Sequence, residues 1–430
     1  TLSCIFALIC NMEFVDKLII LIERYKRAVQ LSAGIIIALI ITITQAKAQN
    51  TEGFMYGKVF TRDNTYQGQL RWGKEEAYWN DHFNSSKVSN RSRQYGPRKR
   101  EDNDDSWSNF DWSFSSIWEN KSSSSHQFVT QFGDIAEIEN VSDSRAIIVL
   151  KNGEEVEVGS QGYNDLSPSI RILDDELGEL SVKWSRVERV QFLPAPSILR
   201  PSFGQALYGT VNIYRKGDLT GYIQWDHDER ISTDKLDGDT RDGDVSISFG
   251  KIRKIESGRG GSDVELLDGR TFYLTGSNDV NSGNRGIIVT VEGVGKIDIP
   301  WKVFNTVTFD PAWKSSGKPY SSYNPPKPLI GTVYTYNDDE ISGRIVFDLD
   351  EAMNIEFLEG RDDEIEYRIP FRNIKSIKPK NYNYSQLKLR NGDTLLLGDG
   401  RDVSDNNDGL LIFQKGSRDP EYISWKKIDE

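Results

Sequence analysis

The sequence predicts an all-β chain made of three tandem repeats, each built from two related halves. The main observation is a signature in which an aromatic residue is followed by an apolar residue three positions later and, where the chain extends far enough, by another at six. Its six copies begin at Phe132, Trp184, Phe249, Trp301, Phe371 and Trp425. The Phe and Trp versions alternate, 52, 52 and 54 residues apart, so each Phe–Trp pair marks one repeat.

Paired glycines give the second observation and fix the repeat boundaries. The repeats span about 54–196, 205–312 and 328–430, and each opens with an apolar-Gly-x-Val strand followed by a second glycine that begins another strand. The pairs are Gly57/Gly68, Gly209/Gly221 and Gly331/Gly343. Apolar and polar residues alternate around them, which indicates half-buried strands.

The third observation is a hairpin signal that opens the second half of each repeat. It reads Asn152-Gly153, Asp268-Gly269 and Asn391-Gly392. An Asx-Gly pair between alternating strands predicts a tight type I′ turn, because both residues tolerate positive φ.

The signature itself predicts a strand, one turn of 3₁₀ helix and a closing strand, with the aromatic and apolar residues in the core. Three strands, a 3₁₀ turn and a strand within about 50 residues is the layout of small SH3-like barrels. The endings Ile299-Pro300-Trp301 and Ile369-Pro370-Phe371 also resemble the closing segment of PRC-barrel domains. That resemblance implies a small β-barrel and no activity. We therefore expect two SH3-like barrels in each repeat.

The alternative is a six-bladed β-propeller, in which each half-repeat forms one four-stranded blade. Two linkers speak against a closed ring: 193–206 contains three prolines, and 311–328 is rich in Pro, Ser, Gly and Tyr. Such joints favour domains arranged in a row.

Residues 1–48 read as an N-terminal leader whose start is Met12. A basic stretch precedes the apolar run 31–44, and Ala46-Lys47-Ala48 forms a small-x-small cleavage site, as in secretory signal peptides. An uncleaved anchor is the alternative. We expect an exported chain of the bacterial periplasm, cell envelope or exterior, with no membrane span after the leader and a third repeat that continues past Glu430.

Charge and composition exclude some function classes. The net charge of −12 argues against nucleic acid, because affinity for phosphates comes from Lys and Arg. Both cysteines, Cys4 and Cys10, precede Met12, so the exported part lacks disulfide and thiol chemistry. The three histidines have no metal-ligand spacing and there is no Gly-x-Ser-x-Gly elbow. The sequence thus favours a non-enzymatic role.

An aromatic insert in repeat 1, at about 79–125, is the first candidate binding site. It contains Trp107, Trp112 and Trp118 among serines and charged residues. Exposed Trp rings stack on sugars and cationic groups, so we expect these three to contact a ligand. The alternative is that they pack onto the first barrel or form a subunit contact.

A candidate Ca²⁺ loop comprises Asp237, Asp239, Asp242 and Asp244. Hard cations take several carboxylate oxygens on a flexible loop, although the EF-hand order of ligands is missing. A solvated turn is the alternative, and no other cofactor is indicated.

Two further acidic features recur between repeats. Corners at Asp226–Glu229 and Asp348–Glu351 follow the second strand, and we interpret them as solvated turns. Asp165, Asp279 and Asp402 occupy matching positions, which indicates a structural role in capping turns by bonding nearby backbone N–H groups.

Taken together, these features favour an exported β-repeat protein that binds an envelope protein or polysaccharide, or acts as an envelope scaffold. The alternative is a secreted or periplasmic hydrolase of glycans, which needs two carboxylates converging on a cleft.

Overall fold

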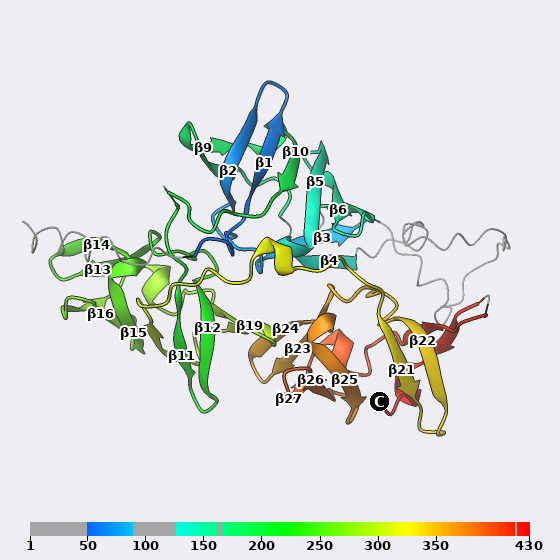
Figure 1. Cartoon of the computed structure of the whole chain (residues 1–430). Coiled ribbons are helices and arrows are strands. Elements are labelled where there is room, and N and C mark those ends of the chain that lie inside the picture. Colours follow the sequence, from blue (N-terminus) through cyan, green and yellow to red (C-terminus); the bar gives the residue numbers. More distant parts are fainter. Residues whose placement is uncertain (1–49, 89–125, 161–164, 201, 418) are drawn as a thin grey trace, which may run out of the picture. The chain divides into compact units, whose positions relative to one another are not determined.

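A computed structural model describes residues 50–88, 126–160, 165–200, 202–417 and 419–430. The chain divides into two units, 1–48 and Gln49–Glu430, of which the second is described below. The described residues form antiparallel β-sheets joined by short 3₁₀ turns, which confirms the all-β prediction (Figure 1). Within them, no helix is long and apolar enough to cross a membrane.

The described residues of 54–196 form ten strands and two 3₁₀ turns. They are β1 (Tyr56–Thr61), β2 (Thr65–Trp72), β3 (His82–Lys87), β4 (His126–Gln131), η3 (Phe132–Asp134), β5 (Ile135–Ser142), β6 (Arg145–Leu150), β7 (Glu155–Gly159), β8 (Ile170–Asp174), β9 (Gly178–Val182), η4 (Trp184–Arg186) and β10 (Val187–Phe192).

Residues 205–312 follow the same order of strands, although their 3₁₀ turns differ. They are β11 (Tyr208–Ile213), β12 (Gly217–Trp225), β13 (Lys235–Thr240), β14 (Gly243–Ser248), η5 (Phe249–Lys251), β15 (Ile252–Gly258), β16 (Gly261–Leu266), β17 (Thr271–Leu274), η6 (Asn278–Val280), β18 (Ile287–Val291), β19 (Gly295–Ile299) and β20 (Phe304–Phe309).

The remaining elements begin with a 3₁₀ turn in the second linker. They are η7 (Tyr320–Ser322), β21 (Ile330–Tyr334), β22 (Glu340–Val346), β23 (Phe357–Asp362), β24 (Ile365–Pro370), η8 (Phe371–Asn373), β25 (Ile374–Pro379), β26 (Tyr384–Leu389), β27 (Thr394–Gly398), η9 (Arg401–Val403), β28 (Leu410–Phe413), β29 (Glu421–Ile423) and η10 (Trp425–Lys427).

The strands of 54–196 form one ten-stranded sheet in the order β4-β3-β7-β6-β5-β10-β1-β2-β8-β9. The strands that follow the two signatures, β5 and β10, pair with each other, with Ile138 opposite Val190. On either side the halves interleave, because β3 pairs with β7 and β8 pairs with β2. Neither half therefore folds as a separate sheet of contiguous strands.

A second sheet of thirteen strands runs from 205–312 into 328–430. Its order is β17-β16-β15-β20-β11-β12-β18-β19-β24-β23-β27-β26-β25, and the junction is the β19–β24 pair, with Ile297 opposite Tyr367. Two smaller sheets are β13-β14 and β21-β22-β28-β29. No closed barrel or propeller is detected among the described strands.

The 3₁₀ turns predicted from the signature are confirmed at five copies, where η3, η4, η5, η8 and η10 begin at the aromatic residue. The sixth copy, at Trp301, forms a hydrogen-bonded turn instead, and its ring is only partly buried. The other five aromatic side chains are buried in the core, Phe371 being the most exposed at 8%.

The paired glycines lie directly opposite each other across hairpins. Gly57 faces Gly68 in the β1–β2 pair, and the matching pairs recur in β11–β12 and β21–β22. A side chain at Gly68 would place its Cβ 2.0 Å from the carbonyl oxygen of Leu173 on β8. Glycine is required here because the neighbouring strand β8, which pairs with β2, lies too close for a Cβ.

The Asx-Gly prediction is correct about the hairpins and wrong about the turn type. Gly153, Gly269 and Gly392 have positive φ, whereas the residue before each does not. Gly153 donates its N–H to Leu150 and the flanking pair closes between Leu150 and Glu154. This is the three-residue loop of a type I turn followed by a left-handed glycine.

Candidate functional site

The turn after the second strand has the same backbone at three places in the chain. At each place the aromatic residue before the turn donates its backbone N–H to the carbonyl oxygen of the glutamate four residues later, at 2.8–2.9 Å. The pairs are Trp72–Glu76, Trp225–Glu229 and Phe347–Glu351. A left-handed residue follows the aromatic one in each case. With the matching aspartate, the three sets are the first corner (Gly73, Glu76, Asp165), the second corner (Asp226, Glu229, Asp279) and the third corner (Asp348, Glu351, Asp402).

The second and third corners each bring three carboxylates together. In each, one oxygen from every acid lies within 4.8 Å of the others. Asp226 is 1% exposed and Asp348 is 2% exposed. The interpretation of these corners as solvated turns is therefore wrong. The sequence showed both parts of each corner but not that a loop 50 or more residues away folds onto the turn.

The matching aspartates bond backbone N–H groups, as the sequence indicated, but the prediction that these groups belong to a nearby turn is wrong. Oδ2 of Asp279 accepts the backbone N–H of Asp237, and Oδ2 of Asp402 accepts that of Glu359. In the first corner Oδ2 of Asp165 accepts the N–H of Asn84. The bonded strand lies more than 40 residues before the aspartate, so the contact joins distant segments rather than capping a local turn.

Each acidic corner has one arginine at its rim, and that arginine is shared. Arg285 pairs with Asp226 at 3.5 Å and with Asp228 at 2.6 Å. At the third corner Arg401 pairs with Asp348 and with Asp408, both at 2.7 Å. Because each guanidinium also serves a carboxylate outside the corner, it does not balance the three charges of the corner.

Burial raises the pKa of most of the acids in the second and third corners. Burial raises the pKa of Asp348 to about 7, and that of Glu229 to about 9 with help from Asp279 and the other nearby acids. Burial and the neighbouring acids raise the pKa of Glu351 and of Asp402 well above the usual range. Carboxylates this close and this buried are costly to ionise without a counter-charge.

The first corner differs because Gly73 replaces the leading aspartate. Its remaining acids are Glu76 and Asp165, each 7% exposed. Burial raises the pKa of Asp165 to about 6 despite two hydrogen bonds from Asn84 that lower it. A cavity of about 590 Å³ opens here, lined by residues that include Lys74, Glu76, Asp165 and Arg171.

Five residues beyond each corner glutamate stands a second carboxylate with a shared role, the latch acid (Asp81, Asp234 or Glu356). One oxygen accepts two backbone N–H groups of its own turn, as Oδ2 of Asp81 does from Ala77 and Tyr78. The other binds a buried cation from elsewhere in the chain. The pairs are Asp81–Arg230, Asp234–Arg71 and Glu356–Lys87, at 3.1, 2.6 and 2.6 Å.

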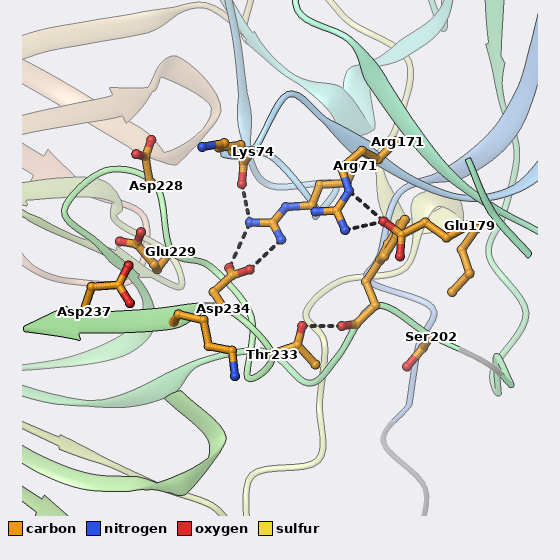
Figure 2. Close-up of a pocket in the computed structure, with 13 residues that line it drawn as sticks. Arg71, Lys74, Arg171, Glu179, Ser202, Asp228, Glu229, Thr233, Asp234 and Asp237 are labelled. Atoms are coloured by element: carbon orange, nitrogen blue, oxygen red, sulfur yellow. Dashed lines mark hydrogen bonds and ion pairs between the residues drawn. The ribbon is translucent and has the colours of Figure 1, made fainter. Parts of the chain in front are cut away.

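A second cavity of about 590 Å³ lies where residues of 54–196 meet residues of 202–237 (Figure 2). Arg71 reaches across it to Asp234, with nitrogen–oxygen distances of 2.6 and 2.8 Å. Arg171 lies along Glu179 and over the ring of Phe203. Lys74 and Arg171 line both cavities, so the two adjoin, and we refer to them together as the polar cleft.

The cleft is lined by both signs of charge. Figure 2 shows the carboxylates of Asp228, Glu229 and Asp237 facing it beside the basic side chains. Glu75, which lines the adjoining cavity, hydrogen-bonds Asp228, and burial together with that contact raises its pKa to about 7.

The sequence-predicted sites lie elsewhere. Trp107, Trp112 and Trp118 fall outside the described residues, between β3 and β4 in the chain. Asp237 and Asp239 lie on β13, Asp242 in the following turn and Asp244 on β14, where Asp239 and Asp244 face each other across the hairpin. None of these four belongs to the acid groups close enough to hold an ion that occur within the described residues.

Comparisons with models of protein families, with curated proteins and with solved structures found no match to this chain.

Proposed function

We propose that this chain is an exported β-repeat binding protein whose polar cleft takes a neutral, hydroxyl-rich glycan of the cell envelope. The observation that carries the proposal is the composition of the cleft, where Arg71, Lys74 and Arg171 stand among Asp228 and Glu229. Mixed donors and acceptors suit vicinal hydroxyl groups, which both give and accept hydrogen bonds. A ligand of one strong charge would meet repulsion from half of the lining.

The latch pairs support a scaffold that holds this cleft in shape. Arg230 and Asp81, both 0% exposed, tie the segment after β12 to the segment before β3. Arg372 joins η8 to Asp134 of η3 at 2.6 Å. Binding sites work best on elements that are themselves fixed. In this proposal three repeats, each of two SH3-like barrels with interleaved strands, provide that support.

The test is glycan binding by the full chain, measured on an array of envelope polysaccharides. The variant Lys74→Ala with Arg171→Ala removes two side chains that line the cleft without touching a latch. We expect at least a tenfold loss of affinity. Arg145→Ala is the matched control, because Arg145 also pairs with a cross-strand glutamate, Glu157, away from the cleft.

A third variant replaces 89–125 by a short turn and tests the aromatic insert separately. Loss of binding here alone would move the site to Trp107, Trp112 and Trp118. Capture of an envelope protein but no glycan, or equal binding by the cleft and control variants, would overturn the proposal.

One observation favours the hydrolase alternative. Burial and the hydrogen bond with Asp228 raise the pKa of Glu75 to about 7, so this carboxyl can hold a proton near neutral pH, as a general acid does. If the cleft cleaves its glycan, Glu75→Gln will abolish product release while leaving binding within a few-fold. Absence of any product with the intact chain would exclude this reading.

A further inference from the structure

We propose that the second and third corners each hold one divalent metal ion, Ca²⁺ in the exported setting, and that the first corner holds none. The ligands are Asp226, Glu229 and Asp279 in one site and Asp348, Glu351 and Asp402 in the other. This goes beyond the proposed glycan binding and does not depend on it.

Geometry is the first support. Three carboxylate oxygens within 4.8 Å is a spacing that mutual repulsion opposes unless a cation lies among them. Calcium takes its ligands from carboxylate oxygens at 2.3–2.6 Å, so oxygens bound to one ion fall within such a group.

The second support is an oxygen without a partner. Oε2 of Glu351 and Oε2 of Glu229 are each buried, and neither has a hydrogen-bond partner within the described residues. A buried acceptor left unpaired costs free energy in a folded protein. Oε2 is the unpaired atom of the matching glutamate at both corners. A metal ion bound at each site would explain why both atoms lack a hydrogen-bond partner.

Charge balance is the third support. Asp348 and Asp402 are 2% and 7% exposed and stand with Glu351 around one point. Arg401 serves Asp348 but also Asp408, and Arg285 divides between Asp226 and Asp228 in the same way. Neither arginine neutralises all three carboxyls of its corner, and a divalent ion would offset the charge that these carboxyls carry when they are ionised.

The backbone contacts of Asp279 and Asp402 leave one oxygen of each for the ion, whereas Asp226 and Asp348 would bind it through oxygens that already accept hydrogen bonds or ion pairs. Asp402 uses Oδ2 for the N–H of Glu359, and Asp279 uses Oδ2 for that of Asp237. In both residues the second carboxylate oxygen remains for the metal. An ion at either corner would therefore join the turn after the second strand to the loop that carries η6 or η9.

The experiment is calorimetric titration of the full chain with Ca²⁺, repeated with Mg²⁺, alongside thermal unfolding in Ca²⁺ and in a chelator. We expect two Ca²⁺ per chain and a higher midpoint in Ca²⁺. Glu229→Gln and Glu351→Gln, which keep the shape and remove the charge, should each reduce the stoichiometry from two to one. The double variant should bind none.

Asp242→Asn with Asp244→Asn is the matched control. These two exposed aspartates belong to the loop that the sequence indicated as a Ca²⁺ site, so the variant removes the same number of charges. We expect it to bind two ions. No heat and no midpoint shift with the intact chain would overturn the proposal, as would a site lost from the loop variant but kept by the double glutamine variant. Circular dichroism of each variant shows whether the sheet has formed.

Discussion

The first and third corners share a backbone but differ in charge. Gly73 and Asp348 follow the same aromatic position, with φ of 59° and 48°, and the glutamate N–H and carbonyl contacts that close the turn are alike. The latch acids Asp81 and Glu356 also act alike. The leading position differs, with glycine in the first corner and aspartate in the third, so the turn and its latch are the structural part that the corners share.

The largest expected effect comes from breaking the part that all corners share. In Asp81→Asn the amide keeps the shape of the carboxylate but leaves the guanidinium of Arg230 buried without its charge partner. Removing one partner of a buried pair costs about 3–5 kcal/mol. Urea unfolding should detect this loss in the free energy of unfolding. An effect below about 1 kcal/mol would show that the latches do not hold the segments together.

A smaller effect is expected in the pH dependence of the chain's stability, and it arises from Asp165 of the first corner. Asp165 has a pKa raised to about 6, mainly by burial, with Asp81 adding and Lys296 opposing. The folded chain therefore binds more protons here than the unfolded chain between about pH 4 and pH 6. The stability that Asp165 contributes is full below that window and is lost as the pH rises through about 6.

Asp165→Asn removes this titration and keeps an oxygen for the N–H of Asn84. Between pH 4 and pH 7 the variant should lose about 2–3 kcal/mol less stability than the intact chain. Chemical unfolding at several pH values measures the difference. Parallel curves for the two proteins would mean that Asp165 is ionised throughout this range.

A single substitution can give the first corner the same three acidic positions as the third. At Gly73 the backbone is already left-handed, as at Asp226 and Asp348, and a Cβ there would meet only the Cβ of Pro168 at 3.4 Å. Gly73→Asp should lower stability in a chelator by about 1 kcal/mol, because an aspartate tolerates positive φ less well than glycine. In Ca²⁺ it should bind a third ion, which titration calorimetry counts. Gly73→Asn is the control and should leave two.

Much of this fold follows from local patterns in the sequence. The signature aromatics predict 3₁₀ turns because side chains three apart share one side of such a turn, and five of six copies form one. At the exception, Trp301, the N–H groups of both Val303 and Phe304 turn back to the carbonyl of Pro300. The interleaving of strands from the two halves of a repeat could not be predicted from the sequence. The pairing of β3 with β7, for example, is set by packing between segments that are distant in the chain.

The sequence showed the parts of the candidate site but not that they lie together. Asp348 to Glu351 and the matching Asp402 were both singled out, but spacing alone did not show that they meet. Whether these acids form a solvated turn or a cluster of carboxylates depends on how deeply they are buried. Burial is a property of the folded chain and does not follow from their spacing in the sequence. By contrast Asp242 and Asp244 have a suggestive spacing but are exposed on a hairpin. A pattern of acids in sequence therefore says less than the same acids brought together by two loops.

Native mass spectrometry of the full chain in Ca²⁺ tests the central claim most directly, because it counts bound ions molecule by molecule. We expect two bound Ca²⁺ ions for the intact chain, one for Glu229→Gln or Glu351→Gln, and none for the double variant. An intact chain that carries no Ca²⁺, or a double variant that still carries two, would contradict it.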